Sequence, residues 1–180
     1  MTSTVALCRA TGTEAGYQMS EQIEADRFRR AMGRFPTGVT IVTAFDAAGE
    51  LCGLTANAFS SVSLDPPLIL VCVNRTTRCY RAMRVSGRFA VHFLRSDQQD
   101  LALGFARKGA DRSGLCRWTD SHNGVPRLEH FDTVIDCDRR DAHGAGDPAI
   151  CVGRVLDIES GGEASEPLLF HEGQLIPWAA

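Results

Sequence analysis

Two polar segments of the sequence carry side chains that could hold an anionic, aromatic ligand. They span residues 55–67 (TANAFSSVSLDPP) and, one strand later, residues 74–79 (NRTTRC). Hydroxyls, exposed amides and the fork of an arginine bind phosphate oxygens and ring carbonyls at close range. Asn57 could hydrogen-bond the polar edge of such a ring, and Ala56 and Ala58 permit close backbone approach. On composition alone, solvent-facing strand serines and a solvated helix arginine are the favoured explanation.

Patterns typical of other chemistries are missing from the sequence. It has no Gly-x-Ser-x-Gly elbow, no His-Glu-x-x-His pair, no Gly-x-Gly-x-x-Gly and no Walker A loop. No histidines or cysteines stand at metal-ligand spacing. We therefore expect no metal, and any nucleotide must be held without a glycine loop. His92, inside the alternating segment 89–93, is predicted to be a hydrogen-bonded structural histidine.

The composition indicates one globular domain in a reducing compartment. The chain has 180 residues, 44% of them hydrophobic, and a net charge of −3. A chain of this length buries about 70% of the surface that its unfolded form exposes, so it needs no disulfide or structural metal in order to fold. The acidic balance argues against a nucleic-acid partner. Seven cysteines cannot all pair within one chain, and four lie in apolar runs where free thiols pack as core.

No segment predicts export or a membrane anchor. Residues 1–19 have no signal-peptide pattern and are expected to form a flexible tail before a single domain over residues 20–180. The longest apolar stretch, residues 68–73, is too short to span a bilayer. We expect a cytoplasmic protein without membrane contact.

Apolar periodicity predicts a mainly β protein with a few flanking helices. A helix should begin at Ser20 and stop at Pro36, and another should open at Ser96 with a capping box closed by Gln99. Residues 111–127 resemble a long loop of the kind that walls a site. Numerous short strands favour a Greek-key antiparallel barrel over a doubly wound sheet. The remaining elements are a helix over residues 77–85 and strands over residues 39–43, 58–64, 68–73, 89–94, 134–138, 149–159 and 168–170.

Five segments together resemble a known family. In order and spacing they are similar to the short-chain flavin reductases, which supply reduced flavin to two-component monooxygenases. The resemblance implies an FMN-binding split β-barrel, usually a homodimer, that binds FMN or FAD, uses NADH or NADPH and serves a flavin-dependent monooxygenase. The match runs from about Phe28 to Gln174 and rests on residues 35–43 (FPTGVTIVT), 55–67, 86–91 (SGRFAV), 153–155 (GRV) and 167–170 (PLLF).

The resemblance also implies which residues bind the cofactors. Arg78 would offset phosphate charge and Asn57 would stabilise electron density on the flavin, with no certain catalytic residue and positioning assigned to Asn57 and His143. Residues 171–174 would face the nicotinamide. The implied cofactor-binding set is Thr37, Leu54, Thr55, Ala56, Asn57, Ala58, Ser61, Cys72, Val73, Asn74, Arg78, Cys79, Gly104, Phe105, His171 and Gly173.

One position departs from the family pattern. The family commonly has Gly-Asp-His before the last long strand, whereas this chain has Gly146, Asp147 and Pro148. Proline lacks an imidazole and a backbone N–H. Three interpretations follow: His143 covers part of the role, Pro148 merely shapes the loop, or the protein binds flavin without reducing it from a nicotinamide, as a carrier or another flavin-dependent oxidoreductase.

Overall fold

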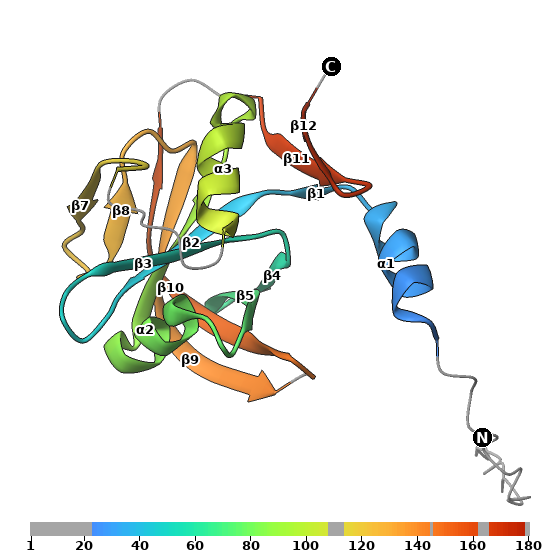
Figure 1. Ribbon diagram of the computed structural model, residues 1–180. Helices are drawn as coiled ribbons and strands as arrows, with labels where there is room; N and C mark the ends of the chain where they lie inside the picture. Colours follow the sequence, from blue (N-terminus) through green and yellow to red (C-terminus); the bar gives the residue numbers. More distant parts are fainter. Residues whose placement is uncertain (1–22, 108–113, 145, 162–165, 179–180) are drawn as a thin grey trace, which may run out of the picture.

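Antiparallel sheets dominate the computed structural model, which describes residues 23–107, 114–144, 146–161 and 166–178 (Figure 1). Three short α-helices accompany them in these ranges. None of the described helices is long and apolar enough to cross a membrane. The elements are α1 (Ala25–Gly33), β1 (Thr37–Gly38), β2 (Thr40–Phe45), β3 (Leu51–Ala56), β4 (Phe59–Leu64), β5 (Pro67–Asn74), α2 (Arg78–Ser86), β6 (Arg88–Phe93), a 3-10 turn η1 (Ser96–Gln98), α3 (Gln99–Ala106), β7 (Trp118–Asp120), β8 (Pro126–Leu128), β9 (Thr133–Gly144), β10 (Pro148–Ser160), β11 (Leu168–His171) and β12 (Gln174–Pro177).

The main sheet is an open antiparallel barrel of seven strands. Its order is β3-β2-β6-β9-β10-β5-β4, and each neighbouring pair is antiparallel. The strands β3 and β4 end this order and are not paired with each other, so the barrel is split between them. The predicted antiparallel split barrel is therefore confirmed. A smaller sheet, β1-β11-β12, carries the chain from the barrel toward α1 (Figure 1).

Two apolar clusters hold the helices against the barrel. Inside it, Phe89 and Met83 are fully buried, and Met83 brings α2 onto the sheet. On the outer side, Phe105 fixes α3 against β3. A Cβ on Gly53 would lie 2.5 Å from the Phe105 ring, so only glycine lets the helix approach the strand this closely. The site elements β3 and α3 are thus locked together by packing.

Several predicted elements differ from the structure. The first helix starts at Ala25, and no residue of it is buried, because its apolar face does not pack on the barrel. The part of this helix predicted over residues 20–22, and the tail, lie outside the described residues. Residues 118–128 form the β7–β8 hairpin, since Gly124 adopts a left-handed turn that brings the short strands together. The predicted capping box is wrong, because Gln98 rather than Gln99 accepts the Arg95 backbone N–H, at 2.9 Å.

Both ring nitrogens of His92 are hydrogen-bonded inside the barrel wall, which confirms its structural role. Its Nδ1 lies 3.1 Å from the Ile41 carbonyl oxygen, and its Nε2 accepts the Leu128 backbone N–H at 3.0 Å. This pattern fixes the neutral tautomer that carries its proton on Nδ1. Burial lowers the pKa of His92 from 6.5 to about 4.

Stability should therefore fall as the pH drops toward 4. His92 has a pKa of 6.5 in the unfolded chain and about 4 in the folded protein. Between these pH values the unfolded state binds a proton that the folded state does not, so acidification favours unfolding. The loss should reach about 3 kcal/mol. Urea unfolding at several pH values measures it. A His92→Gln variant should lack this part of the pH dependence, and an equal slope in both proteins would contradict the assignment.

Candidate active site

A hollow of about 540 Å³ opens between β3, α3 and the β11–β12 hairpin. Its walls are mostly apolar, and Thr55, Asn57 and Gln99 supply polar groups. Concave sites of this size and mixture bind small aromatic ligands. The lining residues are Val39, Thr55, Asn57, Gln99, Ala102, Leu103, Ala106, Phe170, Gly173, Gln174 and Leu175.

Asn57 also borders a second hollow, of about 390 Å³, which β1 helps to line. Its Nδ2 donates a hydrogen bond to Thr37 Oγ1 at 3.2 Å, and Thr37 lines this second hollow. The bond leaves the Asn57 carbonyl oxygen and one amide hydrogen for a ligand. An exposed amide of fixed orientation therefore stands where the two hollows meet.

Hydrogen bonds hold the strand that ends at this amide. Thr55 Oγ1 donates to the Ala102 carbonyl at 2.6 Å, which ties β3 to α3. Thr40 Oγ1 donates to the Ala56 carbonyl at 2.7 Å and ties β3 to β2. Among the described strands β3 pairs with β2 alone, so the backbone groups of its other edge face the split of the barrel. This open edge can supply donors and acceptors to a ligand laid along it.

Arg78 lies near the opposite end of β3, at the start of α2. Its Nη2 donates to Asp46 Oδ2 at 3.0 Å, and it shares a surface hollow with Cys52. The Glu50 backbone N–H, with smaller help from Ala48 and Arg78, holds the pKa of the Asp46 carboxyl below its usual value. Arg78 is thus oriented by a carboxylate while most of its side chain stays exposed.

Several residues of the implied cofactor set are part of the protein core. Val73 and Cys79 are buried inside the barrel, and Cys79 donates to the Val42 carbonyl, so neither side chain reaches a ligand or a thiol reagent. Phe105 packs on Gly53, and a Cβ on Gly104 would lie 2.8 Å from Leu115. We attribute packing roles to these side chains and leave them out of the site proposed below.

The other implied residues lie at the margins of the site. Leu54 packs partly on the core, Cys72 is half-buried, and Ala58 and Ser61 are exposed around the start of β4. Asn74 uses its side-chain oxygen within its own turn, accepting the Thr76 backbone N–H at 2.9 Å.

The β9–β10 hairpin carries His143 and Pro148 away from the hollow. His143 is exposed near the end of β9, and the hairpin tip points away from α3 and β12 (Figure 1). Pro148 begins β10 opposite Asn74, and Arg75 donates to the Gly146 carbonyl at 2.7 Å. Pro148 is thus part of a loop tied to the start of α2. His171, by contrast, pairs with Gln174 in the hairpin that borders the hollow.

The sequence-based site took Gly104 and Phe105 from α3 but missed the residues of this helix that line the hollow. Gln99, Leu103 and Ala106 lie one turn apart and face the hollow, yet Gln99 is predicted above to be a capping residue. These residues are four and three residues apart, a spacing that places side chains on one face of a helix and could have identified this wall of the site. Within the described ranges, His, Cys, Asp and Glu nowhere gather in groups of three or more that could hold a metal ion.

A split antiparallel barrel with a mostly apolar, amide-bearing hollow at its open edge strand defines a flavin-binding split-barrel protein. The chain belongs to the flavin reductase-like domain family, whose sequence profile matches residues 32–179.

Relatives and solved structures agree with this family. The chain is 37% identical to the reductase subunit HsaB of a flavin-dependent monooxygenase from Rhodococcus jostii, over 90% of this chain and 82% of that protein. It is 44% identical to the stachydrine N-demethylase reductase subunit Stc3 of Rhizobium meliloti, over 74% of this chain and 58% of that protein. The NADH:FAD oxidoreductase SgcE6 of Streptomyces globisporus, solved with NAD and FAD fragments, superposes with a TM-score of 0.79 at 33% identity, over 86% of this chain and 92% of that chain. The chain spans about half the length of two relatives from Rhizobium meliloti, 58% of Stc3 and 46% of another protein.

Proposed function

We propose that this protein is an NAD(P)H:flavin oxidoreductase that reduces FMN or FAD and supplies the reduced flavin to a flavin-dependent monooxygenase. The observation that carries the proposal is the fixed Asn57 amide at the junction of two hollows, at the open edge of β3. The family, and its relatives HsaB and SgcE6, support the reaction. The thiols of Cys72, Cys116, Cys137 and Cys151 are free, which suits a cytoplasmic location.

The proposed flavin position follows β3. From Ala56 to Cys52 the strand extends about 13 Å, with Asn57 beyond one end and Arg78 near the other. We place the ring at Asn57 and the phosphate at Arg78. The hollow against α3 and residues 171–174 is left for the nicotinamide.

The protein's contribution to the reaction is positioning. When bound, the flavin would supply the acceptor for a hydride from a nicotinamide, a transfer that needs the two rings about 3–3.5 Å apart. The Asn57 amide can donate to the ring edge on which negative charge develops, and the Thr37 contact holds that amide in place. Leu103 and Phe170, on the wall of the hollow, would keep water away from the bound rings. No acid–base pair is required.

Replacing Arg78 with alanine should weaken flavin binding by about ten-fold, because one charge-assisted phosphate contact is lost. Fluorescence titration with FMN measures the affinity. The rate of flavin reduction at saturating flavin should change little, since Arg78 lies at the phosphate end. Arg117→Ala, at an exposed arginine outside the site, is the control. Unchanged affinity in Arg78→Ala would remove Arg78 from the site.

Oxidation of NADH or NADPH in the presence of FMN or FAD tests the proposed function. The protein should consume at least one nicotinamide in proportion to the flavin reduced. Flavin that binds tightly but is reduced by neither nicotinamide would instead establish the carrier function that Pro148 suggested.

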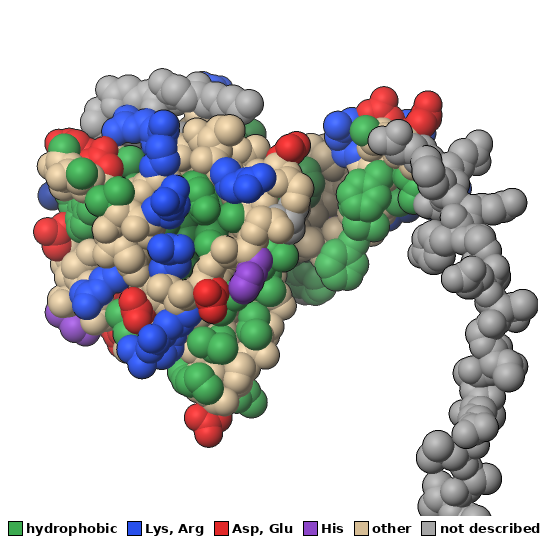
Figure 2. Space-filling model, turned by 90° about the horizontal axis from the view of Figure 1, so that it is seen from below, with side chains coloured by type: hydrophobic (Ala, Val, Ile, Leu, Met, Phe, Trp, Pro, Cys, Tyr) green, Lys and Arg blue, Asp and Glu red, His purple; other side chains and the backbone are tan. Residues whose placement is uncertain are grey.

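A second copy of the chain is part of this proposal. The apolar side chains Phe28 and Met32 of α1 are 58% and 55% exposed, and on β4 Leu64 is 95% exposed. An isolated helix of nine residues is marginal in water. Figure 2 shows hydrophobic side chains gathered on the arm that carries α1. A partner subunit that covers this arm would stabilise it, as expected for a homodimer.

Light scattering should give a mass of two chains of 19.5 kDa. Phe28→Asp with Met32→Asp should shift the protein toward a single chain, because charges would enter the covered face. Arg30→Asp, an exposed change on the same helix, should leave the dimer intact. A single-chain mass for the unmodified protein would contradict the homodimer.

A further inference from the structure

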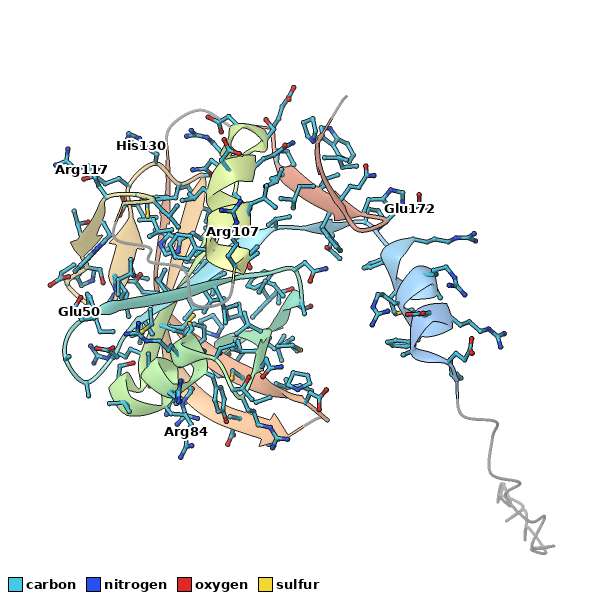
Figure 3. All side chains as sticks on the ribbon, viewed as in Figure 1. Glu50, Arg84, Arg107, Arg117, His130 and Glu172 are labelled. Atoms are coloured by element: carbon cyan, nitrogen blue, oxygen red, sulfur yellow. The ribbon has the colours of Figure 1, made fainter. Side chains whose placement is uncertain are left out.

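One stretch of the chain is basic without interruption. Residues 74–88 contain five arginines and no acidic residue, although the whole chain has a net charge of −3. Three of them, Arg78, Arg81 and Arg84, are exposed along α2. Seen from below, the molecule presents a row of basic side chains across this face (Figure 2). Figure 3 shows Arg84 pointing away from the barrel at the lower end of the molecule.

Intramolecular ion pairs explain little of this charge. Arg78 pairs with Asp46, but no ion pair is recorded for Arg81 or Arg84 within the part of the chain that the structure describes. Because α2 has no Asp or Glu, none of its arginines gains an ion pair one turn away. A positive charge at the start of a helix also opposes the helix dipole. Arg84, in the last turn, lies where the dipole favours a positive charge, but the stability of α2 does not explain Arg78 and Arg81.

Apolar surface lies beside these charges. A hollow of about 410 Å³ separates α2 from the β2–β3 turn, and Ala47, Ala48 and Ala82 contribute to its walls. Val85, on the same hollow, is 66% exposed. Arginines around an apolar centre are typical of protein interfaces, where a buried side chain anchors the contact and charges set its orientation.

We propose that Arg81, Arg84 and Val85 form a docking face for an acidic protein surface that packs an apolar side chain against Val85, at the edge of the hollow. The partner is the oxygenase component that receives the reduced flavin, so this inference rests on the proposed function. The helix α2 packs on β3 and begins at Arg78, so a partner docked there would sit beside the proposed flavin strand. A nucleic acid fits less well, because phosphates would leave the apolar hollow unused.

Binding of a synthetic acidic peptide tests the face. The probe is a labelled peptide of about twelve residues, mostly Glu and Asp with one central Leu, titrated with the full chain at low ionic strength and read by anisotropy. We expect binding that weakens with salt, and a loss of about ten-fold or more in Arg81→Glu/Arg84→Glu. Val85→Asp should weaken binding of the Leu peptide to the level of a peptide with Gly in its place.

The variant Arg84→Glu tests a single charge reversal on the face. Its matched control is Arg117→Glu. Arg117 is 87% exposed at the opposite end of the molecule, and its reversal should leave the affinity within about two-fold (Figure 3). Equal binding by Arg81→Glu/Arg84→Glu and the unmodified protein would overturn the proposal, as would no binding by the unmodified protein or tighter binding of an oligo-dT strand. Reduction of flavin by NADH at saturating flavin should stay unchanged in Arg84→Glu and in Arg117→Glu. If the proposed function is wrong, the unmodified protein will not reduce flavin with NADH. Peptide binding is a separate measurement, so the two failures can be told apart.

Discussion

Replacing Arg127 with methionine should lower the free energy of unfolding by about 3–5 kcal/mol. The Asp136 carboxylate is fully buried, and Arg127 satisfies it through Nε at 2.9 Å and Nη2 at 2.8 Å. Methionine fills similar space but leaves this buried charge with the Asn123 amide as its one remaining side-chain partner among the described residues. Arg127 also contacts Asp157, at 2.7 Å, so its loss removes an ion pair between the β7–β8 hairpin and β10.

Urea unfolding measures this change, and two further variants separate its causes. Arg117→Met removes an exposed ion pair to Glu129 and should cost less than about 1 kcal/mol. Arg127→Met combined with Asp136→Leu should recover much of the loss, because no unpaired buried charge remains. A cost for Arg127→Met no larger than that for Arg117→Met would show that the network contributes little.

Replacing Ala106 with tryptophan should reduce NADH-dependent flavin reduction by about 100-fold with the fold intact. Ala106 is exposed at the end of α3 and lines the hollow of about 540 Å³. An indole there occupies the space assigned to the nicotinamide and displaces it from the flavin, and small displacements of reacting rings cost about this much rate. The ratio of kcat/KM for NADH between variant and unmodified protein measures the effect.

The matched control places the same side chain elsewhere. Thr119→Trp lies on the exposed strand β7, outside the hollow, and should retain activity. In Ala106→Trp the affinity for flavin should change less than kcat/KM for NADH, because the proposed flavin strand lies across the hollow. Full activity in Ala106→Trp would exclude this hollow as the nicotinamide site.

Local patterns predicted the fold well where one segment carried its own signal. The alternation around His92 identified a strand, and Thr77 caps α2 through the Tyr80 backbone N–H at 3.1 Å, close to the predicted start. The sequence did not predict the strand β3, because Gly53 interrupts its apolar pattern. A glycine is needed there because the Phe105 ring, on a helix distant in the sequence, packs against it.

The site was harder to predict because its contacts join distant parts of the chain. Thr55 meets Ala102 across 47 residues, and Arg75 reaches Gly146 across 71. Neither contact leaves a mark on local spacing. The polar segment that ends β3 was visible in the sequence, whereas the wall formed by α3 and the burial of Cys79 follow only from packing.

The most direct test of the central claim is anaerobic reduction of the bound flavin by NADH deuterated at C4 of the nicotinamide. If the two rings stack in the hollow at Asn57, the oxidised-flavin absorbance will disappear in a single turnover, and one of the two C4 deuterated forms will react more slowly than unlabelled NADH. The same measurement on Ala106→Trp should show slow reduction with flavin still bound. Flavin that stays oxidised with both NADH and NADPH in the unmodified protein would contradict the proposed reductase.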